Sequence, residues 1–169
     1  FKEKRVLVTG GAGFIGSEVV SQLIKGGARV TVLDNFSSGK RPYLPKNKNL
    51  KIVKGEIRDE KIVAKVVKDQ EAVVNIAALP FIPDSYFYPG DFFSVNTIGS
   101  VNMLWKSIKS NTTNLFIHIS TSEVYGSAQT VPMNENHPTA PHSTYAVSKL
   151  AADRAAFTLH KENGFPVVV

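Results

Sequence analysis

Tyr145 and Lys149 combine residue types and a spacing that suit proton transfer. Side chains four positions apart share one face of a helix, so the phenol and the ammonium are expected to lie side by side. A neighbouring positive charge favours the phenolate form of a tyrosine. Tyr145 is therefore a candidate general base, although such pairs are also common on ordinary helix surfaces.

A second group of reactive side chains follows the strand-like run 117–119. The next four residues are Ser, Thr, Ser and Glu, at positions 120–123. Hydroxyls and a carboxylate just beyond a strand end are well placed for chemistry, because parallel sheets bind ligands at that edge. Thr121 and Glu123 are the candidate catalytic residues of this cluster.

A glycine-rich turn near the start of the chain predicts a phosphate-binding site. The apolar run 6–8 is followed by Gly10, Gly13 and Gly16 at a spacing of three. Glycine at these positions allows unusual dihedrals, close approach of a pyrophosphate and tight packing of a helix on a strand. The helix that is expected to begin near Phe14 would direct its free N–H groups toward the phosphates.

Asp34 ends a second apolar run, 29–33, and indicates which dinucleotide is bound. A carboxylate at this point hydrogen-bonds the adenosine ribose hydroxyls and repels a 2′-phosphate, which predicts NAD rather than NADP. Further candidate cofactor contacts are residues that follow the ends of the second, third and fourth predicted strands: Asn35, Phe36, Ser37, Ser38, Gly39, Glu56, Ile57, Ala77 and Ala78.

Strands and helices alternate along the whole chain, which predicts one α/β domain over 1–169. The predicted strands are 5–9, 29–33, 50–53, 72–76, 115–119 and 166–169, and the predicted helices are 14–26, 60–68, 91–109 and 143–163. This alternation is typical of a doubly wound parallel sheet with helices on both faces. Long loops at 35–49, 78–90 and 122–142 follow strand ends, where such sheets bind ligands.

The composition argues against several other classes of protein. The chain has no cysteine, which excludes thiolate metal sites and a cysteine nucleophile and fits a cytoplasmic protein. No apolar run is long enough to span a membrane. The net charge of +6 comes from dispersed lysines, so we expect a solvated surface rather than a nucleic-acid interface. The four histidines are scattered, and we expect no metal site.

Together, these motifs resemble the extended short-chain dehydrogenase/reductases, in particular the NAD-dependent epimerase/dehydratase group that acts on nucleotide sugars. The resemblance spans nearly the whole chain and is carried by 9–16, 34–35, 55–59, 77–78, 120–126, Asn96, Tyr145 and Lys149. It implies a Rossmann fold, NAD as cofactor and a UDP- or dTDP-hexose as substrate. Members of the group continue into a smaller C-terminal substrate domain. We expect this chain, which ends inside the sixth strand, to lack that domain and not to turn over alone.

The resemblance also implies a role for individual residues. Tyr145 would take the proton of the sugar O4, Lys149 would hold the nicotinamide ribose, and Thr121 would hydrogen-bond O4. Asn96 resembles a family asparagine that holds the sheet and a helix in register. The implied contacts to the pyrophosphate and adenine come from Phe14, Ile15, Glu56 and Ile57.

Two residues depart from the pattern of the group. Glu56 stands where the family usually has Asp, and its longer side chain is expected to reach adenine with altered geometry. Asn75 stands where the fourth strand often has His, a change for which the sequence suggests no functional reason.

Glu123 is the residue that distinguishes the reactions of this group, all of which begin with hydride transfer from sugar C4 to NAD. A dehydratase needs a carboxylate to remove the proton on C5, whereas an epimerase needs no further acid or base. The Thr-Ser-Glu run resembles several dehydratases and UDP-glucuronate decarboxylases, but 34–39 resembles UDP-glucose 4-epimerases. We therefore predict a nucleotide-sugar 4,6-dehydratase first, an epimerase second and a decarboxylase third.

Two other classes of protein fit the same residues less well. A regulatory NAD sensor without turnover would not need Thr121, Tyr145 and Lys149, and only the net charge suggests a nucleic-acid binder. The resemblance also implies a homodimer through the helices at 91–109 and 143–163. An exposed apolar stripe on the first of these helices would support the dimer: Val101, Leu104, Trp105 and Ile108.

Overall fold

The computed structural model describes residues 1–169 and contains one six-stranded parallel sheet in the order β3-β2-β1-β4-β5-β6. The strands are β1 (Arg5–Thr9), β2 (Arg29–Asp34), β3 (Leu50–Lys54), β4 (Ala72–Asn75), β5 (Leu115–His118) and β6 (Val167–Val168). The strand order reverses between β1 and β4, which is where doubly wound sheets bind ligands. The predicted fold class is therefore confirmed, with strand ends within one residue of prediction.

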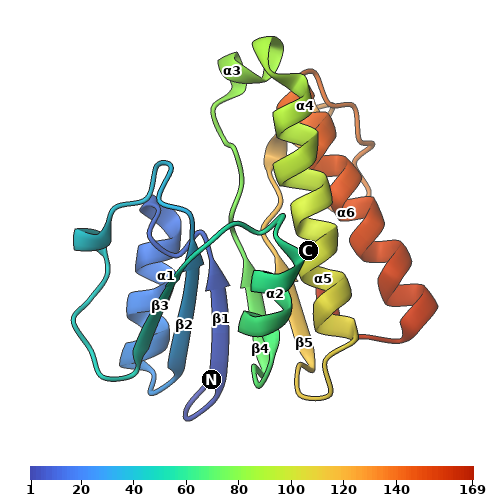
Figure 1. Ribbon diagram of the computed structural model, residues 1–169. Coiled ribbons are helices and arrows are strands. Elements are labelled where there is room, and N and C mark those ends of the chain that lie inside the picture. The colour runs from blue at the N-terminus through green and yellow to red at the C-terminus, as the bar shows by residue number, and fades with distance from the viewer.

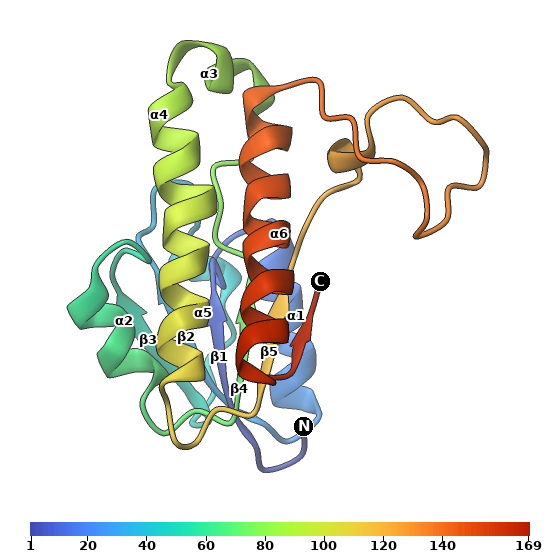
Figure 2. The same cartoon turned by 90° about the vertical axis from the view of Figure 1, so that its right-hand side faces the viewer.

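The helices cover both faces of this sheet (Figure 1). They are α1 (Phe14–Lys25), α2 (Glu60–Val67), α3 (Ile82–Phe87), α4 (Pro89–Phe92), α5 (Ser100–Ile108) and α6 (Thr144–Asn163). A π-helical segment, η2 (Phe93–Gly99), joins α4 to α5, and short 3₁₀ turns form η1 (Arg41–Tyr43) and η3 (Ser122–Tyr125). Figure 2 shows α5 and α6 side by side, with the loop between η3 and α6 projecting from the body.

Alternation along β1 divides the core into two halves, because successive side chains of a strand point to opposite faces. Val6 and Val8 pack with Val20 on the α1 side. Leu7 packs with Met103 on the side covered by α2, α5 and α6. All three β1 residues are fully buried, as the continuous apolar run predicts for a strand covered on both faces.

The segment between β4 and α5 differs from the prediction of a loop followed by one uniform helix. Its first part forms α3, which has a proline in its first turn where the fixed φ and missing N–H are tolerated. Pro89 starts a second helical turn, and the chain then continues through η2 into α5. The helix predicted at 91–109 therefore begins earlier and contains a π-helical stretch.

The sequence of α6 explains why one of its lysines is buried. The helix begins where Ser143 Oγ accepts the N–H of Ala146 at 3.1 Å, and it ends at Gly164, whose φ is +64°. Ala152 and Ala156 are nearly inaccessible, and their small side chains let the helix lie close to the sheet. Lys149 lies on the same stripe, three positions before Ala152, so its side chain points into the protein.

Candidate active site

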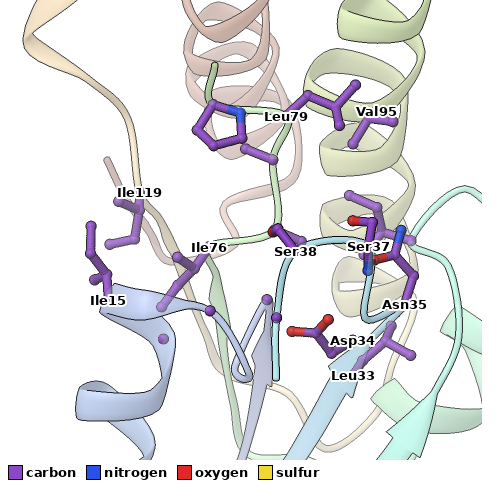
Figure 3. Close-up of a pocket in the computed structure, with 18 of the residues that line it drawn as sticks. Ile15, Leu33, Asp34, Asn35, Ser37, Ser38, Ile76, Leu79, Val95 and Ile119 are labelled. Carbon is purple, nitrogen blue, oxygen red and sulfur yellow. Dashed lines mark hydrogen bonds between the residues drawn. The ribbon is translucent and has the colours of Figure 1, made fainter. Parts of the chain in front are cut away.

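A cavity of about 480 Å³ lies at the carboxyl ends of the strands, around the point where the strand order reverses. Residues that directly follow the ends of β1 to β5 line it, and so do Tyr145 and Lys149 of α6. Every residue predicted to contact the cofactor lines this cavity except Phe36. Figure 3 shows Ile15, Ile76 and Ile119 on one side of the cavity, and Asp34, Asn35 and Ser37 on the other.

Two positions of the glycine-rich turn have no room for a side chain. A Cβ on Gly10, whose φ is +64°, would lie 2.8 Å from the backbone nitrogen of Ala77, and a Cβ on Gly16 would lie 2.1 Å from the carbonyl oxygen of Gly10. Gly13 precedes α1 without a side-chain cap, and the first turn of the helix holds no acidic residue. The N–H groups at this helix start are thus available to an anion in the cavity.

Asp34 links the end of β2 to the glycine turn. Its Oδ2 accepts the backbone N–H of Ala12 at 2.8 Å, and its Oδ1 accepts the N–H of Phe36 at the same distance. Phe36 has a φ of +62°, which turns its ring toward the core on the α1 side and away from the cavity. Phe36 therefore packs against the core and does not line the cavity, and its contact with the cofactor stays a prediction.

Glu56 joins the loops after β2 and β3. Its Oε2 accepts from Asn35 Nδ2 at 3.0 Å and from Arg58 at 3.2 Å, and its Oε1 accepts the backbone N–H of Ile57 at 3.0 Å. Partial burial opposes ionisation of this carboxyl, but the hydrogen bonds from Asn35 and Arg58 outweigh it and lower the pKa. The longer side chain at this position therefore still reaches the edge of the cavity as an anion.

Tyr145 and Lys149 occupy the other end of the cavity. The Tyr145 ring packs edge-on against Phe92, with ring centroids 6.4 Å apart. Lys149 is only 2 % exposed, and its Nζ donates to the carbonyl oxygen of Ile119 at 2.5 Å. Burial lowers the pKa of Lys149 to about 8, against the influence of Asp153, which raises it. No hydrogen bond joins the Tyr145 hydroxyl to Lys149 in this structure.

Thr121 and Glu123 lie on the segment that follows β5 but do not line the cavity. The Thr121 hydroxyl caps η3 by accepting the N–H of Glu123 at 3.3 Å. Glu123 is exposed, and its carboxylate takes part in none of the ion pairs or hydrogen bonds of the structure. The alternative to a catalytic role for Glu123 was a salt bridge with a neighbouring cation. The structure contains no such salt bridge and therefore does not favour that alternative.

Asn96 holds the loop after β4 against α6. Its Oδ1 accepts the N–H of Leu79 at 2.8 Å, and its Nδ2 donates to the Leu79 carbonyl at 3.1 Å and to Ser148 Oγ at 3.0 Å. Asn96 is completely buried. These contacts fit the register-holding role that the resemblance implies, because they fix the helix that carries Tyr145 and Lys149.

Some lining residues were not among the predicted site residues. Ser120 belongs to the hydroxyl cluster recognised in the sequence, and Ile76 and Ile119 directly follow strands, so their positions carried a usable signal. Tyr43 and Val95 come from segments without such a signal. The remaining unpredicted lining residues are Leu33, Gly55, Leu79 and Pro80.

Comparison with known proteins places the chain in a family. The family model described as GDP-mannose 4,6 dehydratase matches residues 7–169. The chain belongs to this family, and the resemblance to the epimerase/dehydratase group is confirmed. A dTDP-glucose 4,6-dehydratase of Streptomyces niveus is 38% identical over 175 residues, which cover 98% of this chain and 52% of that protein.

Solved structures of both activities share the fold. A UDP-N-acetylglucosamine 4-epimerase of Methanobrevibacter ruminantium is 34% identical with a TM-score of 0.93, over 99% of this chain and 54% of that chain. A dTDP-glucose 4,6-dehydratase of Streptomyces venezuelae, solved with NAD bound, is 35% identical with a TM-score of 0.91, over 96% of this chain and 53% of that chain. The chain thus spans about half the length of the relatives it matches.

No helix is both long and apolar enough to cross a membrane. No group of three or more histidine, aspartate or glutamate side chains is arranged to hold a metal ion.

Proposed function

We propose that this chain binds NAD and carries the catalytic residues of a nucleotide-sugar 4,6-dehydratase. The observation that carries the NAD assignment is the carboxylate of Asp34, which lines the cavity directly beside the glycine turn. Gly10 and Gly16 leave space that a Cβ would fill, and the uncapped start of α1 offers N–H groups to a pyrophosphate. A buried carboxylate at Asp34 disfavours a 2′-phosphate, which supports NAD over NADP.

The reaction needs a base and a cation at the far end of the cavity. Bound in the cavity, NAD would supply the hydride acceptor for the oxidation at sugar C4 and the hydride donor for the later reduction at C6. Tyr145 takes the O4 proton, the charge of Lys149 stabilises the phenolate, and Thr121 donates a hydrogen bond to O4. The resulting ketone acidifies the C5 proton, which Glu123 removes. The C6 hydroxyl takes up a proton from water and leaves, and Glu123 returns its proton, exchanged with solvent, to C5 as the hydride reaches C6.

The dehydratase is preferred to an epimerase because Glu123 is an exposed carboxylate without a cationic partner, two residues after Thr121. An epimerase has no use for such a group. The family match and the Streptomyces relative agree with this preference. The epimerase remains the second candidate, because 34–39 resembles the epimerase sequence and a solved epimerase superposes closely.

A single substitution in the full-length protein tests the role of Glu123. Glu123→Gln keeps the size of the side chain and removes its basicity, so oxidation at C4 is expected while elimination fails. Reduced nicotinamide should then accumulate in a single turnover with a UDP- or dTDP-hexose. Glu135→Gln, an exposed acid in the same long loop, is the matched control and should behave as the unaltered protein. A Glu123→Gln protein that completes turnover at the normal rate contradicts the dehydratase proposal.

We further propose a homodimer through the outer faces of η2, α5 and α6. Ile98, Trp105 and Phe157 are 61%, 39% and 49% exposed, which is unusual for large apolar side chains on adjacent helices. The stripe expected on α5 is only partly exposed, because Leu104 is buried in the core. Light scattering of the unaltered protein and of Ile98→Glu tests the dimer, which should dissociate in the variant. The cytoplasmic location stays a prediction.

A further inference from the structure

A chain of buried polar side chains runs behind the cavity from β1 toward α6, and it begins at Thr9. The Thr9 hydroxyl accepts the backbone N–H groups of Ile76 and Ala77, both at 3.1 Å. Its own proton is then free to be donated, and it goes to Asn75 Oδ1 at 2.7 Å. This bond fixes the orientation of the Asn75 amide, with its oxygen toward Thr9.

The amide orientation in turn fixes the tautomer of His118. Asn75 Nδ2 donates to Ser100 Oγ at 3.0 Å and to His118 Nδ1 at 3.2 Å. A ring nitrogen that accepts a hydrogen bond carries no proton, so the neutral imidazole has its proton on Nε2. Burial, together with the charge of Lys149, lowers the pKa of His118 to about 3, and the ring is therefore neutral at physiological pH.

The Nε2–H of His118 has one suitable acceptor. Nε2 lies 3.5 Å from both Lys149 Nζ and Asp153 Oδ1. An ammonium can only donate, so the imidazole proton faces the carboxylate. Asp153 Oδ1 is buried and has no hydrogen-bond partner, whereas Oδ2 accepts from Ser120 Oγ at 2.5 Å. The carboxylate is thus held by Ser120 on one side and faced by His118 on the other.

We propose that Asp153 is a positioning residue for the reaction, held by Ser120 and faced by His118, so that its negative charge keeps the buried ammonium of Lys149 charged beside Tyr145. The proposal rests on the proposed function, which gives Lys149 its role. Lys149 forms no ion pair within 4.0 Å, and a buried ammonium without a nearby anion is costly. Asp153 lies one helical turn further along α6, on the same side as Lys149.

Among the groups that surround Lys149, Asp153 is the one that can supply a negative charge. From β5 it faces the neutral ring of His118 and the carbonyl of Ile119, and on α6 the titratable neighbour is Tyr145. Burial lowers the pKa of Lys149, and Asp153 is the charged group that opposes this. Burial raises the pKa of Asp153, whereas the hydrogen bond from Ser120 and the charges of Lys149 and Arg154 oppose that rise and favour the anion. Lys149 loses its charge as the pH rises, so removal of Asp153 should move that loss to lower pH.

The experiment is an NMR titration of the full-length protein with NAD, labelled with ¹³C at the lysine ε-carbon. The Lys149 resonance is assigned by its absence from Lys149→Arg. In Asp153→Asn the midpoint of its titration should fall by about one pH unit, and the alkaline limb of the turnover profile should move with it. Asp153→Glu restores the charge and should restore the midpoint. Glu162→Gln removes an exposed acid at the end of α6 and should leave the midpoint unchanged.

The outcomes separate this proposal from the proposed function. A folded Asp153→Asn protein with an unchanged Lys149 midpoint overturns the proposal, even if its activity is reduced at every pH. Asp153→Ser removes the same charge with less bulk and gives the same test if the amide variant does not fold. If the unaltered protein shows no turnover, the proposed function fails, while the NMR midpoint still reports whether Asp153 governs Lys149.

Discussion

The carboxylate of Asp34 accepts the backbone N–H of Ala12 at 2.8 Å, which ties the end of β2 to the turn that follows β1. A single side chain therefore faces the cavity and braces the loop that forms its floor. In the proposed NAD site, selection of the dinucleotide and the shape of the phosphate-binding turn would be coupled through this residue.

Asp34→Asn is expected to weaken NAD binding and to reduce discrimination against NADP. The amide can no longer accept from both Ala12 and Phe36 with two anionic oxygens, and it lacks the charge that repels a 2′-phosphate. The Kd for NAD should rise roughly tenfold or more, as measured by isothermal titration calorimetry. Asp69→Asn, at an exposed site, is the control. Unchanged affinities for both dinucleotides would show that Asp34 does not face the ribose.

Gly16→Ala should destabilise the protein by about 3 kcal/mol, because its Cβ would overlap the carbonyl oxygen of Gly10 and force the turn apart. Gly90→Ala is the matched control, since nothing lies within 4 Å of a Cβ at that position. That variant should be neutral or slightly more stable. Urea unfolding measures both changes, and equal stabilities for the two variants would contradict the close contact between Gly16 and the carbonyl of Gly10.

The glycine turn and the ends of the strands could be predicted because their signals are local. Apolar runs followed by glycine or by a polar residue predict where a strand stops, and the lining residues that were predicted from sequence follow such ends, except Tyr145 and Lys149 on α6. Phe36 follows a strand end but does not line the cavity, because its ring packs against the core, and a sequence pattern does not show its positive φ. Helix α3 and the π-helical stretch of η2 were missed because prolines and packing against α6 set their geometry.

The network behind Lys149 could not be predicted for a different reason. Thr9, Asn75, His118 and Asp153 come from three strands and a helix, and only the register of the parallel sheet brings them together. The departure at Asn75 had no explanation in the sequence. In the structure its amide bridges Thr9, Ser100 and His118, so the substitution belongs to a buried hydrogen-bond network.

His118 should make the protein less stable as the pH falls below neutrality. Its pKa is lowered from 6.5 to about 3, so between these values the unfolded chain binds a proton that the folded protein does not. The contribution to stability is present above pH 6.5 and is lost as the pH falls, at up to about 1.4 kcal/mol per pH unit. His118→Gln keeps a side-chain donor and should flatten this part of the profile in urea unfolding.

His142→Gln is the control for that measurement, because His142 is exposed and lies outside the network. It should leave the decline with pH intact. A decline of the same steepness in His118→Gln and in the unaltered protein would mean that another group is responsible for it.

The product formed by the full-length protein in deuterated water tests the central claim most directly. The protein is incubated with NAD and a panel of UDP- and dTDP-hexoses, and the products are identified by NMR. We expect a 4-keto-6-deoxy sugar that carries deuterium at C5, because Glu123 exchanges its proton with solvent during elimination. A C4 epimer without solvent deuterium would contradict the dehydratase assignment and leave Glu123 without a role in the reaction.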